Sequence, residues 1–162
     1  MTILELCERI ETWSIPTLIR ESATLFPLVE SIHVMALAFV VGSISIVDLR
    51  LLGFASRKQS VKQLSDDLLP WTWGAFAIAA ITDLLLFSSV ATRYYDNMPF
   101  RWKLVLLLLA GINMLAFHFL TYRDVGRWGR DEVPPTAARV AGGVSILLWT
   151  AVVVCGRWIG FI

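Results

Sequence analysis

Two histidines lie inside long apolar stretches of this sequence, together with several charged side chains. His33 follows Glu30 by three residues in a run from about Ala23 to Val47, and His118 lies in a later run. An ionisable group in such a segment is costly in lipid, so each one marks a candidate functional site. A histidine there can bond to a neighbouring helix, shuttle a proton, or ligate a metal or a haem iron.

The two histidines predict haem b as the first candidate cofactor. His33 and His118 would lie on the first and third membrane helices, and either or both would ligate the iron. The propionates would bind Arg157 or Lys103 near one membrane surface, or Arg50 near the other. Such a protein would pass electrons to or from a quinone or a partner redox protein.

A single haem held by both histidines requires that both lie at nearly the same depth. Counted from the outer ends of their helices, His33 is about ten residues in and His118 about eighteen. At about 1.5 Å per residue, their depths differ by roughly 12 Å. The difference shrinks if the first helix begins near Thr17 and bends at Pro27. Otherwise each histidine holds its own cofactor, or a symmetric homodimer pairs His33 with its copy. The same histidines are the candidate ligands for a metal ion without haem.

Carboxylates in the same apolar runs predict a different function, a transporter or complex subunit without a cofactor. Asp83 lies near the middle of the second run at about the depth of His33, and Glu30 shares a helical face with His33. The predicted proton or ion path consists of Glu30, Asp83, Asp48 and Asn113, with His33 and Arg157 beside it. The simplest alternative for Asp83 is an interhelical hydrogen bond or ion pair, and for Asp48 with Arg50 it is an interface anchor at the inner end of the first span.

Depth alone sorts the polar groups into two layers. The outer layer contains His33, Asp83, Glu30, Arg157 and Lys103, and the inner layer contains Asn113, His118, Asp48 and Arg50. Glu30 and His33 match half of the Glu-x-x-His element of di-metal bundles, but the second copy is missing. Glu30 is therefore expected to accept from an imidazole N–H or to pair with Arg157.

The composition places these residues in a membrane protein that contacts the lipid bilayer. The 162 residues are 57% hydrophobic, well above the roughly 45–50% of an average soluble domain. A net charge of +1, with the basic residues dispersed, argues against nucleic-acid binding. Cys7 and Cys155 have no second ligand at metal spacing and are expected to be unpaired thiols.

Four apolar runs must position the candidate residues, at about 23–47, 68–92, 100–122 and 137–160. Each is long enough for a membrane helix, which needs roughly 20 residues. Short connections favour an all-α, up-down-up-down four-helix bundle in a single membrane domain, residues 1–162. Residues 1–16 predict an amphipathic interfacial helix instead of a cleavable signal, and Ser14 and Pro16 favour a new helical start.

The ends of the predicted spans carry tryptophan and tyrosine, as expected for residues at a membrane interface. The connections after the first and third spans hold eight Lys and Arg residues, against six on the opposite side. This difference places both chain termini outside. Small residues on spans one and four predict close helix packing there; they are Gly42, Ser43, Ser45, Gly142, Gly143 and Ser145.

Three segments, ESIHVMALAFVVGSISIVDLRLLG, INMLAFHF and WTAVVVCGRWIGFI, carry a family resemblance. From about Ser22 to Ile162 the chain resembles an uncharacterised family of small bacterial four-helix membrane proteins, a domain of unknown function. The resemblance implies that the protein lies in the bacterial inner membrane, and it carries over no established activity. More distantly, the architecture is similar to b-type cytochrome membrane subunits, the membrane protein of bacterial copper resistance and haem-dependent membrane protoporphyrinogen oxidases. Two-haem cytochromes need four histidines, and this chain has two.

Overall fold

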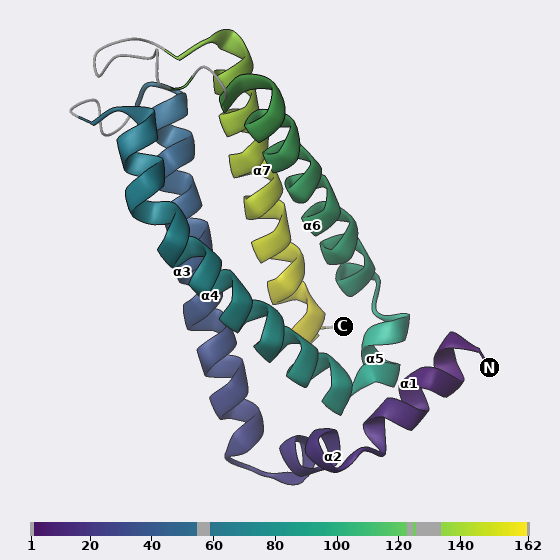
Figure 1. Cartoon of the computed structure of the whole chain (residues 1–162). Coiled ribbons are helices and arrows are strands. Elements are labelled where there is room, and N and C mark those ends of the chain that lie inside the picture. Colours follow the sequence, from purple (N-terminus) through teal and green to yellow (C-terminus); the bar gives the residue numbers. More distant parts are fainter. Residues whose placement is uncertain (1, 55–58, 123–124, 126–133, 162) are drawn as a thin grey trace.

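The computed structural model describes residues 2–54, 59–122, 125 and 134–161, and the regular elements within them are helices (Figure 1). Two short helices come first, α1 (Ile3–Glu11) and α2 (Ser14–Glu21). The long helices α3 (Leu25–Leu51) and α4 (Val61–Ser89) follow, and then the short α5 (Ala91–Asp96). Helix α6 (Met98–Ala116) continues into a π-helix, Phe117–Thr121. Helix α7 (Thr136–Trp158) ends in a 3-10 turn, Ile159–Phe161.

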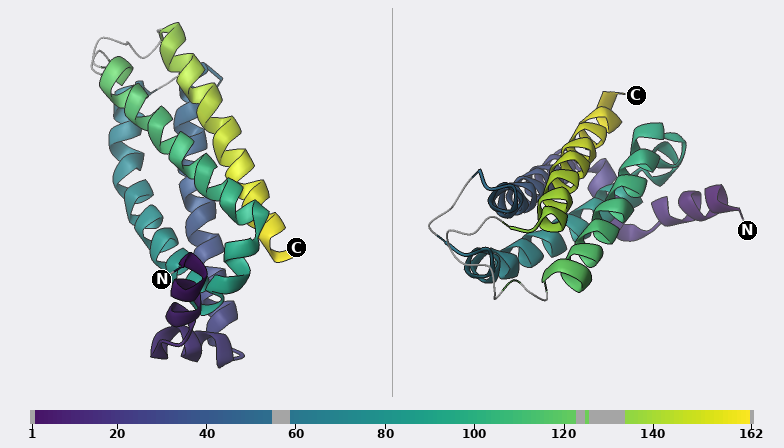
Figure 2. Two further views of the ribbon diagram at one scale, coloured as in Figure 1. Left: turned by 90° about the vertical axis from the view of Figure 1, so that its right-hand side faces the viewer. Right: turned by 90° about the horizontal axis from the view of Figure 1, so that it is seen from above.

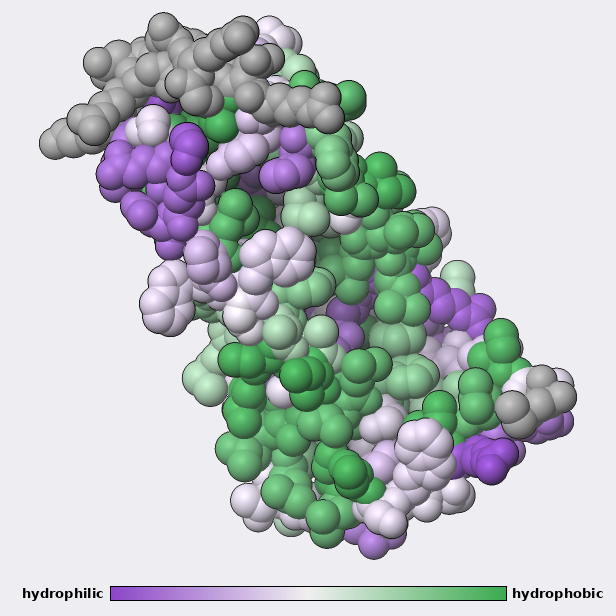
Figure 3. Space-filling model, viewed as in Figure 1, coloured by the Kyte–Doolittle hydropathy of each residue, from purple (hydrophilic) through white to green (hydrophobic). Residues whose placement is uncertain are grey.

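Four of these helices are long and apolar enough to cross a membrane: α3, α4, α6 with its π-helix, and α7 with its final turn. Large hydrophobic side chains are exposed along them, and apolar residues cover much of the surface in Figure 3. Exposed leucine, isoleucine and phenylalanine side chains are favourable against lipid but not against water. The chain is therefore a multi-pass membrane protein of the all-α class, as the sequence predicts.

The helix boundaries differ from the predicted spans mainly at α4. This helix begins at Val61 instead of near 68, because Ser60 accepts a hydrogen bond from the Gln63 amide and caps the first turn. Its first two turns are polar and contain an exposed Lys62–Asp66 ion pair, so hydropathy alone does not reveal them. Five of the eight basic residues counted for orientation lie outside the described residues; they are Arg57, Lys58, Arg123, Arg127 and Arg130.

Helices α3 and α4 pack as an antiparallel pair. His33 lies against Ala79, and ten residues further along α3 the Ser43 hydroxyl accepts a hydrogen bond of 2.8 Å from Thr72. Residue numbers thus rise on α3 as they fall on α4. Ser43 and Thr72 are both buried, so this pair joins the two helices through polar groups inside an apolar interface.

Helices α6 and α7 form a second antiparallel pair, which lies beside α3 (Figures 1 and 2). Asn97 Nδ2, just before α6, donates to the Ile159 carbonyl oxygen at 3.3 Å. Near the other end of α6, Asn113 Nδ2 donates to the Ala141 carbonyl oxygen at 3.0 Å. Asn113, a predicted path residue, thus makes an interhelical hydrogen bond to α7.

The two helix pairs meet where α7 crosses the end of α3. A Cβ atom added to Gly142 would lie 3.1 Å from the Asp48 carbonyl oxygen and 3.1 Å from Leu51 Cβ. Both distances are tighter than an ordinary van der Waals contact. Gly142 thus permits the close approach of α3 and α7 that small residues at this crossing predict.

The N-terminal segment forms two helices at the end of the bundle, with α1 next to α5 and α2 next to α4 (Figures 1 and 2). The new start at Ser14 agrees with the sequence prediction. Glu11 accepts hydrogen bonds from the Thr92 amide at 2.7 Å and the Thr92 hydroxyl at 2.8 Å. Arg20 donates to the Ser89 carbonyl oxygen at 3.3 Å. The Glu11 carboxylate thus binds the first turn of α5, and the Arg20 guanidinium binds the last turn of α4. Helix dipoles favour both contacts, since they attract anions to the start of a helix and cations to its end.

We expect Glu11→Ala to loosen this attachment. The substitution leaves the Thr92 donors without their partner, a loss of about 1.5–3 kcal/mol for hydrogen bonds to a charged group. Hydrogen exchange in detergent should become faster in α1 and in the first turn of α5. Glu8→Ala is the matched control, because Glu8 is an exposed acid of the same helix. Equal exchange rates in the two variants would show that Glu11 does not anchor α1.

Candidate functional site

Three ionisable side chains from three helices meet at Asp83. Lys103 Nζ of α6 donates to Asp83 Oδ1 of α4 at 2.7 Å, and His33 Nε2 of α3 lies 3.7 Å from the same oxygen. The side chains are 7% exposed for Lys103, 12% for His33 and 30% for Asp83. We call these three residues the Asp83 cluster. They belong to the predicted outer polar layer, and all three lie within membrane-compatible helices.

The other ring nitrogen of His33 is bound to α4. Its Nδ1 lies 3.0 Å from the Ala79 carbonyl oxygen and 3.1 Å from Thr82 Oγ1. The Thr82 hydroxyl has carbonyl acceptors in its own helix, at Ile78 and Ala79. The Nδ1–H therefore donates to the carbonyl oxygen of Ala79. This bond fixes the ring so that the basic Nε2 faces the Asp83 carboxylate, where a bound proton would be stabilised.

Tyr94 of α5 lies close enough to the Asp83 cluster for the charges of Asp83 and Glu30 to act on its phenol. Its ring packs against Phe87 and Phe100, with centroids 6.0 and 5.0 Å away. Burial, reinforced by those two charges, raises the pKa of Tyr94 above its ordinary value, so the hydroxyl stays neutral near pH 7. In the sequence, the position of Tyr94 at the end of a predicted span indicates only a residue at the membrane interface, because nothing in its spacing distinguishes it from the other tyrosines.

Glu30 and Arg157 share the depth of the Asp83 cluster but do not join it. Glu30 is exposed, and no hydrogen bond or ion pair joins it to His33 or Arg157 within the residues that the structure describes. Arg157 is exposed too, with its guanidinium 5.2 Å from the centroid of the Phe161 ring. Neither role expected for Glu30, orienting the imidazole or pairing with Arg157, is present in this arrangement.

His118 lies at the opposite end of α6 from the Asp83 cluster. It is exposed on the π-helix, and its ring stacks on Tyr122 with centroids 5.4 Å apart. His118 follows Lys103 by fifteen residues, which corresponds to roughly 22 Å along a helix. Within one chain, His33 and His118 therefore do not converge on one haem iron or one metal ion. Of the two depth differences considered for the sequence, the structure therefore agrees with the larger one, in which the two histidines lie far apart.

We expect His118→Ala to leave the fold and the Asp83 cluster unchanged. The exposed ring loses only its stacking on Tyr122, so the free energy of unfolding should fall by less than about 1 kcal/mol. Thermal unfolding in detergent, followed by tryptophan fluorescence, checks this. A fall in the free energy of unfolding well above this limit would contradict the placement of His118 outside the core.

The inner polar groups make separate contacts. Asp48 is buried and is hydrogen-bonded to Ser145 of α7. Arg50, two residues later, turns away and donates from Nε to the Gln59 carbonyl oxygen at 3.0 Å. The two side chains therefore do not face each other, as their spacing predicts.

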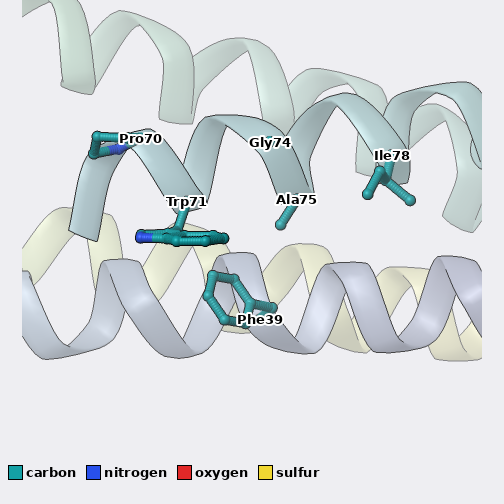
Figure 4. A pocket seen from close by; sticks show the side chains of 6 residues that line it. All are labelled: Phe39, Pro70, Trp71, Gly74, Ala75 and Ile78. Atoms are coloured by element: carbon teal, nitrogen blue, oxygen red, sulfur yellow. The ribbon is translucent and has the colours of Figure 1, made fainter. Parts of the chain in front are cut away.

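An apolar groove of about 500 Å³ runs between α3 and α4 (Figure 4). Its lining residues are Phe39, Pro70, Trp71, Gly74, Ala75 and Ile78. The Phe39 and Trp71 rings lie next to each other between the two helices. Because no lining residue is ionisable, the groove can hold a hydrocarbon chain but supplies no proton-transfer group.

The described residues contain no group of three or more His, Cys, Asp or Glu side chains that could hold a metal ion. Cys7 is buried and Cys155 half-buried, and both are free thiols. The polar chemistry of the described chain is thus centred on the Asp83 cluster in the outer layer and on Asp48 in the inner layer.

Comparison with known proteins identifies one family. Residues 22–162 match a family whose description reads "Family of unknown function (DUF6644)". No curated protein and no solved structure matches the chain, so the architectural likeness to b-type cytochrome subunits gains no support. The match begins at α3 and includes every residue of the Asp83 cluster. On this match, which covers nearly the whole length, the chain belongs to this family of unknown function.

Proposed function

We propose that this protein transfers protons through the Asp83 cluster, as a transporter or as a subunit of a larger membrane complex. The supporting observation is the meeting of Lys103, Asp83 and His33, from three helices, on one carboxylate oxygen. Charged groups within membrane helices are rare because lipid penalises them, and they commonly mark ion or proton pathways. The Lys103–Asp83 ion pair is enough to join α4 to α6, so a purely structural role does not require His33 near the same oxygen.

In the proposed transfer, each residue of the cluster has its own part. Lys103 Nζ donates to Asp83 Oδ1 at 2.7 Å and holds the carboxylate in place beside His33. An arriving proton binds His33 Nε2, and the imidazolium is stabilised by the carboxylate 3.7 Å away. The Ala79 carbonyl oxygen retains the Nδ1–H throughout, so the proton enters and leaves through Nε2 alone.

The proposal places the cluster in the outer half of a bacterial inner membrane, with both chain termini outside. This orientation follows from the excess of Lys and Arg in the opposite connections. The neutral hydroxyl of Tyr94 belongs to α5, which follows the outer end of α4, and is the proposed route for proton entry because the charge of Asp83 acts on it.

Proton flux in liposomes tests this function. The purified protein is reconstituted with a pH-sensitive dye inside, and a potassium gradient with valinomycin drives proton entry. We expect flux above that of empty liposomes, reduced at least tenfold by His33→Gln, because glutamine can donate to Ala79 but cannot take up a proton. His118→Gln is the matched control and should keep wild-type flux. Equal flux in the two variants would overturn the proposal.

A loss of flux must be separated from a loss of fold. Elution as one monodisperse peak in detergent and an unchanged unfolding temperature are required of every variant before reconstitution. Asp83→Asn combined with Lys103→Met provides a second inactive variant, in which both charges are removed together and the helices keep similar side-chain volumes. Wild-type flux in this double variant would also count against the proposal.

Haem b bound through His33 alone is the second candidate function, with a quinone or a partner redox protein as the electron partner. The observation in its favour is the Nδ1–H donated to Ala79, because a histidine ligand usually donates its other ring N–H in this way. Iron at Nε2 would require Asp83 to move from its position 3.7 Å away. An absorption spectrum after expression with added haem tests this candidate. A Soret band lost in His33→Ala but kept in His118→Ala would favour it over proton transfer.

A further inference from the structure

A second acidic group is buried where α3 crosses α7. Asp48 is 5% exposed, and its carboxyl is hydrogen-bonded to Ser145. Its Oδ2 atom is buried and has no hydrogen-bond partner among the residues that the structure describes. The close approach of α7 at Gly142 encloses the site, since a Cβ there would meet the Asp48 backbone oxygen at 3.1 Å.

No charged side chain balances Asp48 within the described residues. Arg50 on the same helix donates to the Gln59 carbonyl oxygen. On α4, Lys62 pairs with Asp66, and these two residues and Asp67 are exposed. On α7, Arg139 is exposed at the first turns of the helix.

These surroundings are unfavourable for a carboxylate and suitable for a carboxylic acid. An ionised group that is buried without a counter-charge loses several kcal/mol of solvation, and an unpartnered anionic oxygen adds to that loss. A protonated carboxyl carries no charge and can donate its O–H to the Ser145 oxygen. Its remaining carbonyl oxygen tolerates the absence of a donor far better than an anionic oxygen does.

We propose that Asp48 is a second proton-binding site, which holds a proton in the inner half of the membrane and exchanges it with the inner aqueous side. The assignment of an inner site rests on the proposed proton transfer. Asp48 is one turn from the end of α3 at Leu51, so its route to water is short. The buried Ser43–Thr72 hydrogen bond lies between the two proton sites, roughly 15 Å along α3 from His33 and roughly 8 Å from Asp48.

Covalent labelling with dicyclohexylcarbodiimide, an apolar reagent that enters lipid, tests whether Asp48 is protonated. The carboxyl O–H adds across one C=N bond of the reagent: its proton goes to nitrogen and its oxygen to the central carbon. An acyl shift to nitrogen then gives a stable N-acylurea, and no atom is lost. Mass spectrometry of peptides from the full-length protein should find the adduct on Asp48. The adduct should be absent from Asp48→Asn and retained in the Asp83→Asn, Lys103→Met double variant.

Infrared spectroscopy in detergent gives a second measurement that does not depend on access of the reagent. We expect a protonated-carboxyl carbonyl band that disappears in Asp48→Asn. If both the adduct and this band are missing from the wild-type protein, Asp48 is ionised and the proposal is overturned.

Proton flux then tests exchange. Asparagine resembles the neutral acid in shape and hydrogen bonding, so Asp48→Asn should fold as the wild type does while its flux falls at least tenfold. Wild-type flux in Asp48→Asn, with the adduct present on the native protein, would make Asp48 a structural acid and overturn the exchange role. The two proposals fail separately: flux that needs Asp48 but survives His33→Gln removes only the Asp83 cluster from the path.

Discussion

Asp83→Asn should lower the free energy of unfolding by about 3–5 kcal/mol, the loss found when one partner of a buried ion pair is removed. The expected loss is large because Lys103 is the more deeply buried partner, with its side chain only 7% exposed. Without the carboxylate, the ammonium must either remain charged in apolar surroundings or lose its proton. Unfolding in detergent, followed by tryptophan fluorescence, measures the change.

Two further variants show whether the loss comes from the unpaired charge. Adding Lys103→Met to Asp83→Asn should recover most of the lost stability, because a neutral apolar side chain then fills the same space. Asp66→Asn is the matched control, since it breaks an exposed Lys–Asp pair with side chains 54–55% exposed. It should change the stability by less than about 1 kcal/mol. If the double variant is no more stable than Asp83→Asn, the unpaired Lys103 charge is not the cause.

Gly142→Val should be the second most damaging substitution and should lower the free energy of unfolding by about 1–3 kcal/mol, as overpacking does. A Cβ at this position already lies 3.1 Å from backbone and side-chain atoms of α3, and the valine methyl groups extend further. Helices α3 and α7 would have to separate at their crossing. Loss of the monodisperse elution peak at a lower temperature in detergent provides the measurement.

Gly111→Val is the matched control for the crossing. Gly111 also lies in the middle of a membrane-compatible helix, but a Cβ there would meet no atom within 4 Å. Both substitutions place the same β-branched residue in a helix, so the difference between them isolates the contact with α3. Equal thermal stability of the two variants would mean that α7 can move away from α3 without loss.

The membrane fold can be read from the sequence because its cause is local. A run of some twenty apolar residues leaves a helix as the only structure that satisfies its backbone in lipid, which is why all four long helices are predictable. The polar start of α4 cannot be predicted in this way, because the two turns from Val61 depend on the Ser60 cap and lie outside the apolar run. The N-terminal segment divides after Glu11, and Ser14 and Pro16 indicate the second start.

The candidate site can be predicted only in part, because depth follows from counting residues whereas rotation about the helix axis does not. His33, Asp83 and Lys103 were placed in one layer by depth, and they meet. Glu30 and Arg157 have the same depth, but they lie on exposed faces of their helices. Those faces depend on how α3 and α7 rotate when they pack, which involves contacts between residues far apart in the chain. The role of Tyr94 is hidden for the same reason.

The two N-terminal helices matter for how this protein can be shortened. The family match begins at residue 22, yet Glu11 and Arg20 bind the corner at which α4 turns into α5. A fragment trimmed to the matched residues would keep every membrane helix but leave the Thr92 amide and the Ser89 carbonyl oxygen without these partners. That corner adjoins Tyr94 and the Asp83 cluster. Truncation at the family boundary would therefore remove these contacts from the end of the bundle that carries the Asp83 cluster, so expression work should retain residues 1–21.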